Sequence, residues 1–242
     1  MRPYCYNYGI NKIIVVSENT VNLTPITFNK NGGYFEPESI NYFFNLVNNR
    51  KDNSNILDIG AQSGLYTLYA KFIPTSSFFS YEPNIEVYNL LKENCQLNNI
   101  NNAILVNKGL SDSTGILTLK IPYDPDEKGL SCFGNSPIRF SKYYISNVEV
   151  TTIDNDFFDK DIPVHFIKCD TEGWEVNILK GGEKTIKKWK PELFLEVNET
   201  NLNQCSQTKD NLMDILYEYG YSLKNIVNNE NYHFTHTDSV TN

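Results

Sequence analysis

The sequence lacks any hydrophobic run long enough to cross a membrane. The longest early apolar run, Ile13 to Val16, spans four residues. A transmembrane helix needs about 20 such residues and the core of a signal peptide about 7–15. We therefore expect a cytoplasmic protein with no membrane partner.

Cysteine is scarce and scattered along the chain. The five cysteines lie tens of residues apart, at Cys5, Cys95, Cys132, Cys169 and Cys205. Their odd number and the absence of a C-x-x-C pair argue against both a disulfide framework and a zinc site. We expect them to be buried or free thiols.

Positive charge is also in deficit. Lysine and arginine together number 21 against 29 acidic residues, which gives a net charge of −8. Such a chain has no general attraction to phosphate backbones or anionic lipids, so nucleic acid is not the expected partner. The one small basic cluster, Lys184, Lys187, Lys188 and Lys190, is typical of a solvated helix face.

Material for a core is plentiful, because 40% of the 242 residues are hydrophobic and 13% are aromatic. This composition excludes wholesale disorder. The short β-like runs Ile13–Val16 and Val21–Phe28 precede a helical segment from about Pro37 to Asn49. We interpret residues 1–53 as an N-terminal cap and residues 54–242 as the main domain.

After residue 54 the pattern alternates between buried strands and helix faces. The expected strands are Ile56–Ile59, Ser77–Tyr81, Ala103–Val106, Val164–Cys169 and Leu193–Val197. This alternation predicts an α/β fold, a mostly parallel sheet with helices on both faces. An excursion interrupts it: Ile116–Ile121, then a lid-like loop at about 122–147, then Val148–Thr152.

The chain ends in a predicted hairpin. Tyr221–Val227 and Tyr232–Thr235 flank an Asn-rich turn. Dinucleotide-binding Rossmann domains usually continue with parallel units. The antiparallel C-terminal strand instead resembles the Rossmann-like seven-stranded sheet of class I S-adenosylmethionine methyltransferases.

A glycine turn after the first strand of the main domain predicts a cofactor. The segment Asp58-Ile59-Gly60-Ala61-Gln62-Ser63-Gly64 stands where open α/β sheets bind ligands. Gly60 permits a tight turn, and Gly64 lets the helix sit against the strand. Gln62 replaces the middle glycine of G-x-G-x-x-G, so a methionine-bearing nucleoside fits better than a dinucleotide. Glu82 follows Gly60 by 22 residues, close to the ~20 expected of an acid that holds a ribose diol.

Several ordered motifs between about residues 54 and 200 match one known family. They are Asp58-Ile59-Gly60-Ala61-x-x-Gly64-x-Tyr66-Thr67, Tyr81-Glu82-Pro83-Asn84, Phe166-Ile167-Lys168-Cys169-Asp170-Thr171-Glu172-Gly173-Trp174-Glu175, Leu179-Lys180-Gly181-Gly182, and Pro191-Glu192-Leu193 leading to Glu196-Val197. The chain thus resembles the FkbM-type methyltransferase family. The resemblance implies a class I fold, S-adenosylmethionine as methyl donor, and O-methylation of a hydroxyl on a sugar, glycan or other small metabolite.

The resemblance also implies which loops bind the cofactor. It places Asp58, Gly60 and Gln62 near the methionine portion and Glu82 on the ribose. Ala61, Gly64 and Pro83 belong to the same two turns, and Gly109, Leu110, Ser111 and Asp112 form a turn near adenine. Asp112 fits a turn-capping role equally well. The family usually has Asn where this chain has Gln62, and both side chains are amides.

The chemistry of methyl transfer directs attention to the end of the fourth parallel strand. The reaction is an in-line displacement, so alignment of the reactants supplies most of the catalysis. A base that removes the acceptor's proton can add about 10²–10⁴-fold. Asp170 and Glu172 are the candidate bases, and Asp170 is also a candidate cofactor contact. Lys168 shares a side of the strand with Asp170, and either pairs with it or meets substrate; His165 lies roughly 17 Å away and is interpreted as structural.

Oxygen ligands at two strand ends leave a magnesium site open. Asp170, Glu196 and Asn198 can together hold Mg²⁺, which would orient an acceptor diol. The alternative, which we favour, is that Asp170 contacts the cofactor and Glu196 caps the sheet.

The acceptor has no recognisable sequence signature, although a small molecule or glycan is expected. Aromatic residues in and beside the loop either stack on a sugar face or pin the loop to the core: Tyr123, Phe133, Phe140, Tyr143 and Tyr144. His233 and His236 lie in the terminal hairpin and are interpreted as structural.

Three other functions stay open as alternatives. Ribose 2′-O-methylation of RNA is the nearest, but residues 191–198 lack the lysine that it usually requires. An NAD-dependent oxidoreductase is opposed by the missing middle glycine. A non-catalytic cofactor-binding module is opposed by the intact acids Asp58, Glu82 and Asp170.

Overall fold

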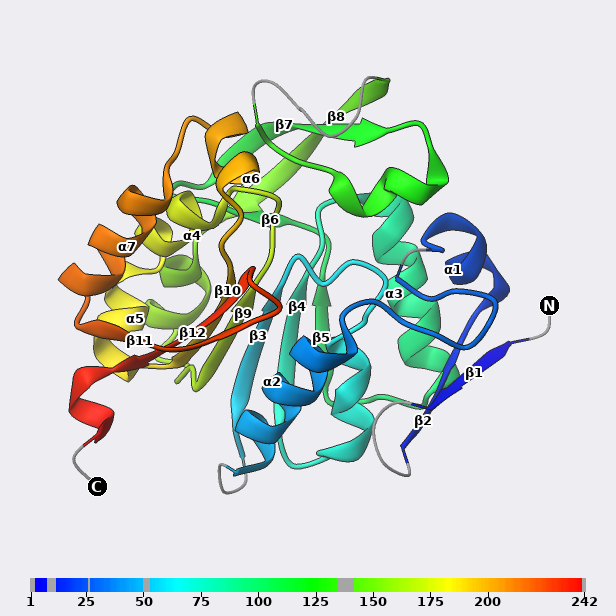
Figure 1. Cartoon of the computed structure of the whole chain (residues 1–242), viewed down its shortest axis with the longest axis horizontal. Coiled ribbons are helices and arrows are strands. Elements are labelled where there is room, and N and C mark those ends of the chain that lie inside the picture. Colours follow the sequence, from blue (N-terminus) through cyan, green and yellow to red (C-terminus); the bar gives the residue numbers. More distant parts are fainter. Residues whose placement is uncertain (1–2, 8–11, 26, 50–52, 135–141, 241–242) are drawn as a thin grey trace.

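A seven-stranded sheet runs through the middle of the molecule (Figure 1). The computed structural model describes residues 3–7, 12–25, 27–49, 53–134 and 142–240. The strand order is β11-β12-β10-β9-β3-β4-β5. The parallel strands are β3 (Asn55–Ile59), β4 (Ser77–Tyr81), β5 (Ala103–Val106), β9 (Phe166–Cys169) and β10 (Glu192–Glu196). β12 (Asn231–His236) is antiparallel and enters between β10 and β11 (Tyr221–Val227), which confirms the predicted class I α/β fold.

Helices cover both faces of this sheet. One face packs against α2 (Pro37–Asn49), the 3₁₀ helix η1 (Thr67–Phe72) and α3 (Ile85–Leu97). The other packs against the π-helical turn η3 (Asp154–Phe158), α4 (Glu175–Gly181), α5 (Glu183–Trp189) and α7 (Lys209–Glu218). Strand alternation divides the side chains between the layers: Ile56 and Phe166 join the first, Leu57 and Ile167 the second.

The N-terminal segment is a small hairpin followed by a helix. β1 (Tyr4–Asn7) pairs antiparallel with β2 (Ile13–Val16), and α1 (Glu18–Leu23) follows. The β-like prediction for Val21–Phe28 is therefore wrong. Ser17 starts the helix as its N-cap, where its side chain accepts the N–H of Thr20, and such a cap favours helix over strand.

The helix predicted after β3 is the short 3₁₀ helix η1. Gly64 has a φ of +106°, which is outside the helical region, so the helix that follows β3 can begin only after Gly64. At the other end of the chain, the sequence pattern missed α6 (Glu199–Gln204), a six-residue helix that follows β10 and that Asn198 caps. The short 3₁₀ helix η4 (Thr237–Val240) follows β12.

The excursion between β5 and β9 is a second sheet with a covering turn. β7 (Gly115–Pro122) pairs antiparallel with β8 (Tyr143–Thr151), and β6 (Gly109–Leu110) pairs parallel with β8. The loop predicted at 122–147 is thus too long, because residues 143–147 pair with β7. Within it, the 3₁₀ helix η2 (Pro125–Leu130) lies over the main sheet's carboxyl edge; residues 135–141 lie outside the described part.

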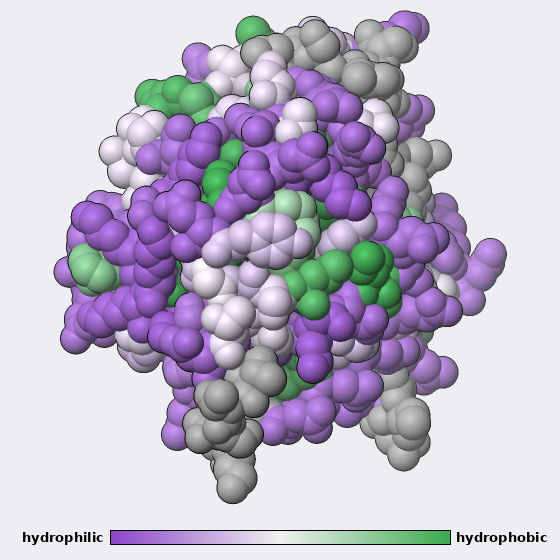
Figure 2. Space-filling view, turned by 60° about the vertical axis from the view of Figure 1, so that its left-hand side comes forward, coloured by the Kyte–Doolittle hydropathy of each residue, from purple (hydrophilic) through white to green (hydrophobic). Residues whose placement is uncertain are grey.

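The exterior carries little continuous apolar surface on the face seen in Figure 2. Hydrophobic side chains appear there in small separate groups among hydrophilic ones. No helix in the described part of the chain is both long and apolar enough to cross a bilayer.

Candidate functional site

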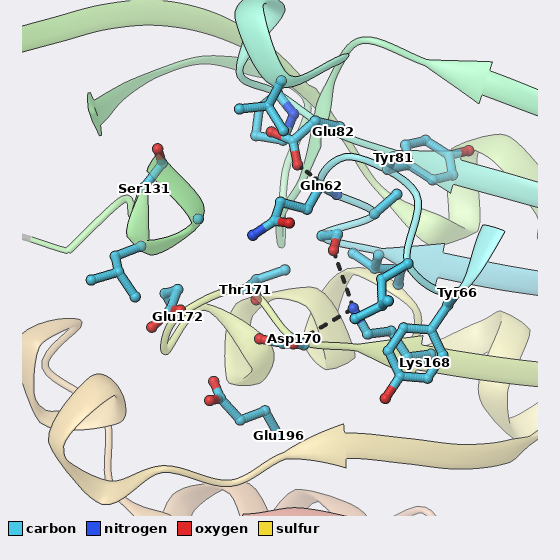
Figure 3. Close-up of a pocket in the computed structure, with 18 of the residues that line it drawn as sticks. Gln62, Tyr66, Tyr81, Glu82, Ser131, Lys168, Asp170, Thr171, Glu172 and Glu196 are labelled. Atoms are coloured by element: carbon cyan, nitrogen blue, oxygen red, sulfur yellow. Dashed lines mark hydrogen bonds and ion pairs between the residues drawn. The ribbon is translucent and has the colours of Figure 1, made fainter. Parts of the chain in front are cut away.

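A cavity of about 300 Å³ opens at the carboxyl ends of the parallel strands. Its walls come from the turns after β3, β4, β9 and β10, from the N-terminal segment and from η2 and its neighbours (Figure 3). Ligand pockets typically enclose about 300–1,000 Å³. The predicted site residues that line it are Gly60, Ala61, Gln62, Glu82, Pro83, Gly109, Leu110, Lys168, Asp170, Glu172 and Glu196.

The turn after β3 brings bare backbone to the cavity wall. Gly60 (φ +72°) and Gln62 (φ +48°) both have left-handed backbone. The N–H groups of Gly60 and Ala61 donate to the carbonyl of Tyr81 at 3.1 and 3.0 Å. A Cβ on Gly60 would lie 1.9 Å from the carbonyl oxygen of Asp170, so only glycine fits at this position.

Main-chain donors fix Glu82 at the end of β4. The N–H of Gln62 donates to one carboxylate oxygen at 3.0 Å, and the N–H of Asn84 donates to the other at 2.8 Å. Burial raises the pKa of Glu82 to about 7, although these two hydrogen bonds lower it. The carboxylate faces the cavity and keeps lone pairs for further donors (Figure 3).

Lys168 lies at the centre of a buried ion-pair network beside the turn. Its Nζ is 3.6 Å from Asp58 and 3.6 Å from Asp170, and it donates to the carbonyl of Gly60 at 3.1 Å. Burial acts to lower the pKa of Lys168, but the charges of Asp170 and Asp58 hold it above the ordinary value. Of the two predicted roles of Lys168, the structure shows the pairing with Asp170. The hydrogen bond from Lys168 to the carbonyl of Gly60 ties β9 to the glycine turn.

Asp58 and Gly64 do not line the cavity, although both were expected near the cofactor. Asp58 is 1% exposed and accepts the hydroxyl hydrogen of Thr67 at 2.7 Å. Burial raises its pKa, while the charge of Lys168 lowers it. Gly64 faces α3, where an added Cβ would lie 3.0 Å from Leu91. Both residues support the turn from behind rather than touching what lies in the cavity.

The turn at residues 109–112, which was expected near adenine, also lies only partly at the cavity wall. Gly109 and Leu110 line the cavity, whereas Ser111 and Asp112 do not. The hydroxyl of Ser111 accepts the indole N–H of Trp174 at 3.2 Å. Asp112 is exposed, and its carboxylate accepts the hydroxyl hydrogens of Ser111 and Ser113 at 3.2 Å each.

Carboxylates gather at the opposite end of the cavity. Asp170 and Glu172 follow β9, and Glu196 ends β10 (Figure 3). Burial and then the charges of Asp170 and Glu172 raise the pKa of Glu196 well above its ordinary range. The two candidate bases are thus brought together, and Glu196 joins them from the next strand.

Three residues from the two ends of the chain line the cavity although the sequence did not predict them as site residues. Glu36, before α2, and Asn231, in β12, line the cavity and are linked by a 2.7 Å hydrogen bond from the Asn231 amide to the Glu36 carboxylate. Burial and then the charge of Asp170 raise the pKa of Glu36. Thr27 also lines the wall, and its hydroxyl donates to the side chain of Gln62. No local motif marks these residues, because the tertiary fold alone brings them to the site.

Of the aromatic residues that could either stack on a sugar or pin the loop to the core, only one described residue lines the cavity. Phe133 lines the cavity and packs on Trp174 with ring centroids 5.4 Å apart. Tyr123 and Tyr144 pack on each other instead, and neither lines the cavity. Tyr143 is an exposed residue of β8 that does not line it either. Phe140 lies outside the described residues.

The described residues give no support to the magnesium site. Among them, no group of three or more His, Cys, Asp or Glu side chains is arranged to hold a metal ion. The amide of Asn198 is engaged at both atoms: Oδ1 accepts the N–H of Asn201 at 3.1 Å, and Nδ2 donates to Glu230 at 2.8 Å. Asn198 therefore caps α6 and does not complete a ligand set with Asp170 and Glu196.

The histidines have structural partners. Nδ1 of His165 accepts the N–H of Asn55 at 2.9 Å. His233 lies 2.7 Å from Glu192, and the N–H of Asp238 donates to His236 at 3.1 Å.

Three of the four lysines in the cluster pair with carboxylates. Lys187 pairs with Glu183 at 2.6 Å, Lys188 with Asp161 at 2.5 Å and Lys190 with Asp238 at 2.5 Å. Such exposed ion pairs are typical of a solvated helix face.

Known proteins are similar to this chain in sequence and in structure. The family model for the methyltransferase FkbM domain matches residues 58–223. "Methyltransferase 1" of Beauveria bassiana (strain ARSEF 2860) is 27% identical over 146 residues, which cover 54% of this chain and 59% of that protein. The chain therefore spans about three fifths of the length of this curated relative.

Two solved structures are similar to this chain at low identity. Methyltransferase FkbM from Methylobacillus flagellatus KT has a TM-score of 0.47 and 19% identity, covering 76% of this chain and 43% of that chain. M. jannaschii TYW2, solved in complex with AdoMet, has a TM-score of 0.47 and 14% identity, covering 96% of this chain and 83% of that chain.

Proposed function

The chain belongs to the FkbM family of S-adenosylmethionine-dependent methyltransferases, and from that premise we propose that it methylates a hydroxyl of an uncharged sugar, glycan or other small metabolite. The observation that carries the proposal is the polarity of the cavity. A fixed carboxylate, Glu82, stands at one end, and Asp170, Glu172 and Glu196 stand at the other. Both ends of the cavity therefore present carboxylate oxygens, which accept hydrogen bonds from the hydroxyl groups of a ligand.

The residues after β3 and β4 fit the methyl donor. The bare backbone at Gly60 allows a close approach, and the two backbone N–H groups leave Glu82 oriented toward the cavity. We assign Glu82 to the ribose hydroxyls, Gly60 and Gln62 to the methionine portion, and Leu110 to the adenine side. When bound, S-adenosylmethionine supplies a methyl group activated by a positively charged sulfur, which suits an acidic cavity.

The charge of the lining supports an uncharged acceptor. Its acidic members are Glu36, Glu82, Asp170, Glu172, Glu196 and Glu230. Its lysines are already paired: Lys108 with Glu149 at 2.8 Å, Lys128 with Glu86 at 2.8 Å, and Lys168 with Asp58 and Asp170. A phosphate or carboxylate on the acceptor would meet like charge here, whereas a polyol donates hydrogen bonds to these oxygens.

The same carboxylates suit proton removal from a hydroxyl. The acceptor oxygen forms a bond to the methyl carbon while the carbon–sulfur bond breaks, and that electron pair stays on sulfur. The hydroxyl proton passes to a carboxylate oxygen at the end of the cavity where Asp170, Glu172 and Glu196 lie, which we call the acceptor end. A base placed within hydrogen-bond reach can contribute about 10²–10⁴-fold, and the candidates are Asp170, Glu172 and Glu196.

A transfer assay with methyl-labelled S-adenosylmethionine tests the proposal. The acceptors are methyl glycosides of neutral hexoses, the corresponding hexose phosphates, and a total RNA preparation. We expect label in the neutral glycosides, as an alkali-stable ether, and at least tenfold less in the phosphates. Label in RNA alone would favour the ribose 2′-O-methylation alternative, and label in the phosphates alone would contradict the charge argument.

A further inference from the structure

Asn201 connects two carboxylates at the acceptor end of the cavity. Its Nδ2 donates to Glu172 at 2.7 Å and to Glu196 at 3.3 Å. The residue itself is 1% exposed and lies in α6, outside the cavity lining. One amide nitrogen carries two hydrogens, so it can serve both carboxylates at once.

The backbone of the β9 turn is pressed against this asparagine. Glu172 has a φ of +57°, a left-handed conformation that residues with a Cβ adopt rarely. Gly173 follows with a φ of +101°, and a Cβ there would lie 2.0 Å from the carbonyl oxygen of Asn201. The side chain of Gln204 also donates to the carbonyl of Glu172 at 2.9 Å. Such strain persists only where the surroundings impose it, and it clusters at functional sites.

The amide of Asn201 is oriented by the carboxylates alone. Its Nδ2 makes both hydrogen bonds to them, while its Oδ1 is buried and has no hydrogen-bond partner among the described residues. Its backbone N–H is held by the cap residue Asn198. A buried carbonyl without a partner is costly, so the contact with Glu172 and Glu196 must outweigh it.

We propose that Asn201 is a positioning residue that holds Glu172 and Glu196 side by side, facing the acceptor hydroxyl whose proton one of them receives. This inference rests on the proposed methyl transfer. Two carboxylates repel each other unless a donor lies between them, and the Asn201 amide is that donor. Asp170, by contrast, is already paired with Lys168. Glu172 and Glu196 therefore supply the proton-accepting oxygens, and the Asn201 amide fixes the positions of these oxygens.

The test compares Asn201→Ala with Asn203→Ala. Asn203 is an exposed residue of the same helix, so it controls for the loss of an asparagine from α6. Thermal unfolding first shows that both variants fold. With the best glycoside of the transfer assay, we expect kcat of Asn201→Ala to fall by about 10²-fold, while the Kd for S-adenosylmethionine stays within threefold of the native value. Asn203→Ala should match the native protein in both.

A second measurement keeps the inference testable if no glycoside is methylated, an outcome that would count against the proposed function only. A crystal structure of Asn201→Ala with S-adenosylhomocysteine should show the carboxylate of Glu172 moved away from that of Glu196, because the variant lacks the amide that donates to both. Unchanged carboxylate positions, or a kcat equal to that of Asn203→Ala, would overturn the inference. Should Asn201→Ala fail to fold, the same comparison with Asn201→Ser decides.

Discussion

The end of the cavity that we assign to the cofactor is formed by two consecutive turns, after β3 and after β4. The acceptor end is formed by segments that lie far apart in the chain. Gly60, Gln62 and Glu82 lie within 23 residues of sequence. Glu36 and Glu196, which face the other end, are separated by 160 residues, and Asn231 and Asn201 orient them from two further elements. The cofactor end is therefore formed by residues close together in the sequence, and the acceptor end is assembled by tertiary packing.

This difference extends to how the carboxylates are held. Glu82 receives two backbone N–H groups, and no substitution that keeps the fold removes such donors. Glu36 and Glu196 receive side-chain amides, which mutation can replace. The cofactor end can therefore stay constant while the acceptor end changes, as expected where one donor serves different acceptors.

The largest effect is expected from Gly60→Ala at the cofactor end. A Cβ there would lie 1.9 Å from the carbonyl of Asp170, and the alanine would also keep a left-handed φ. We expect at least a 10³-fold loss of S-adenosylmethionine affinity by calorimetry, or failure to fold. Gly32→Ala is the matched control, because Gly32 has a φ of +84° with nothing within 4 Å of the added Cβ. It should cost only about 1–2 kcal/mol of stability; equal damage in both variants would show that the clash is unimportant.

Local signals made the cofactor end predictable from sequence. The glycine turn after β3 and the acid after β4 are recognisable because a strand, a turn and a helix follow one another within a few residues. The same signals include Asp58, which belongs to the motif but is buried outside the cavity lining and paired with Lys168. Sequence spacing specifies which turn reaches the ligand, but not which of its side chains points inward.

The acceptor end was predictable only where residues sit at a strand end. Asp170, Glu172 and Glu196 follow from the topology of the sheet. Glu36 does not, because it directly precedes α2 and only the packing of that helix on the sheet brings it to Asn231 of the terminal hairpin. The metal hypothesis for Asn198 failed for a local reason, since the unrecognised helix α6 uses that residue as its cap.

An intermediate effect is expected from Glu82→Gln, which keeps the shape of the side chain but removes the charge. The new amide would turn its NH₂ toward one of the two N–H groups that now donate to the carboxylate. Loss of a charged acceptor for the ribose hydroxyls should weaken S-adenosylmethionine binding by about 10²-fold. Asp112→Asn, at the neighbouring turn but outside the cavity, is the control and should leave the Kd unchanged.

The pH dependence of binding sharpens this test. The pKa of Glu82 is raised to about 7, so between its ordinary value of 4.5 and about 7 the folded protein retains a proton that the unfolded chain has lost. The resulting stability is present below pH 4.5 and is lost as the pH rises through 7. Ionised Glu82 is the better acceptor of two hydroxyls, so affinity for S-adenosylmethionine should rise up to about tenfold from pH 6 to pH 8. Glu82→Gln should lack that rise.

The smallest effect is expected from Glu36→Gln at the acceptor end. The glutamine carbonyl can still accept the Asn231 amide, so the wall keeps its shape and only a charge is lost. That charge stands near Asp170 and belongs to the surface that accepts hydroxyl donors, so its loss should raise the KM for a neutral glycoside by about three- to tenfold. The Kd for S-adenosylmethionine should stay within twofold, in contrast to Glu82→Gln. A parallel loss of donor affinity in Glu36→Gln would mean that the two ends are not separable, because one set of carboxylates would then serve both ligands.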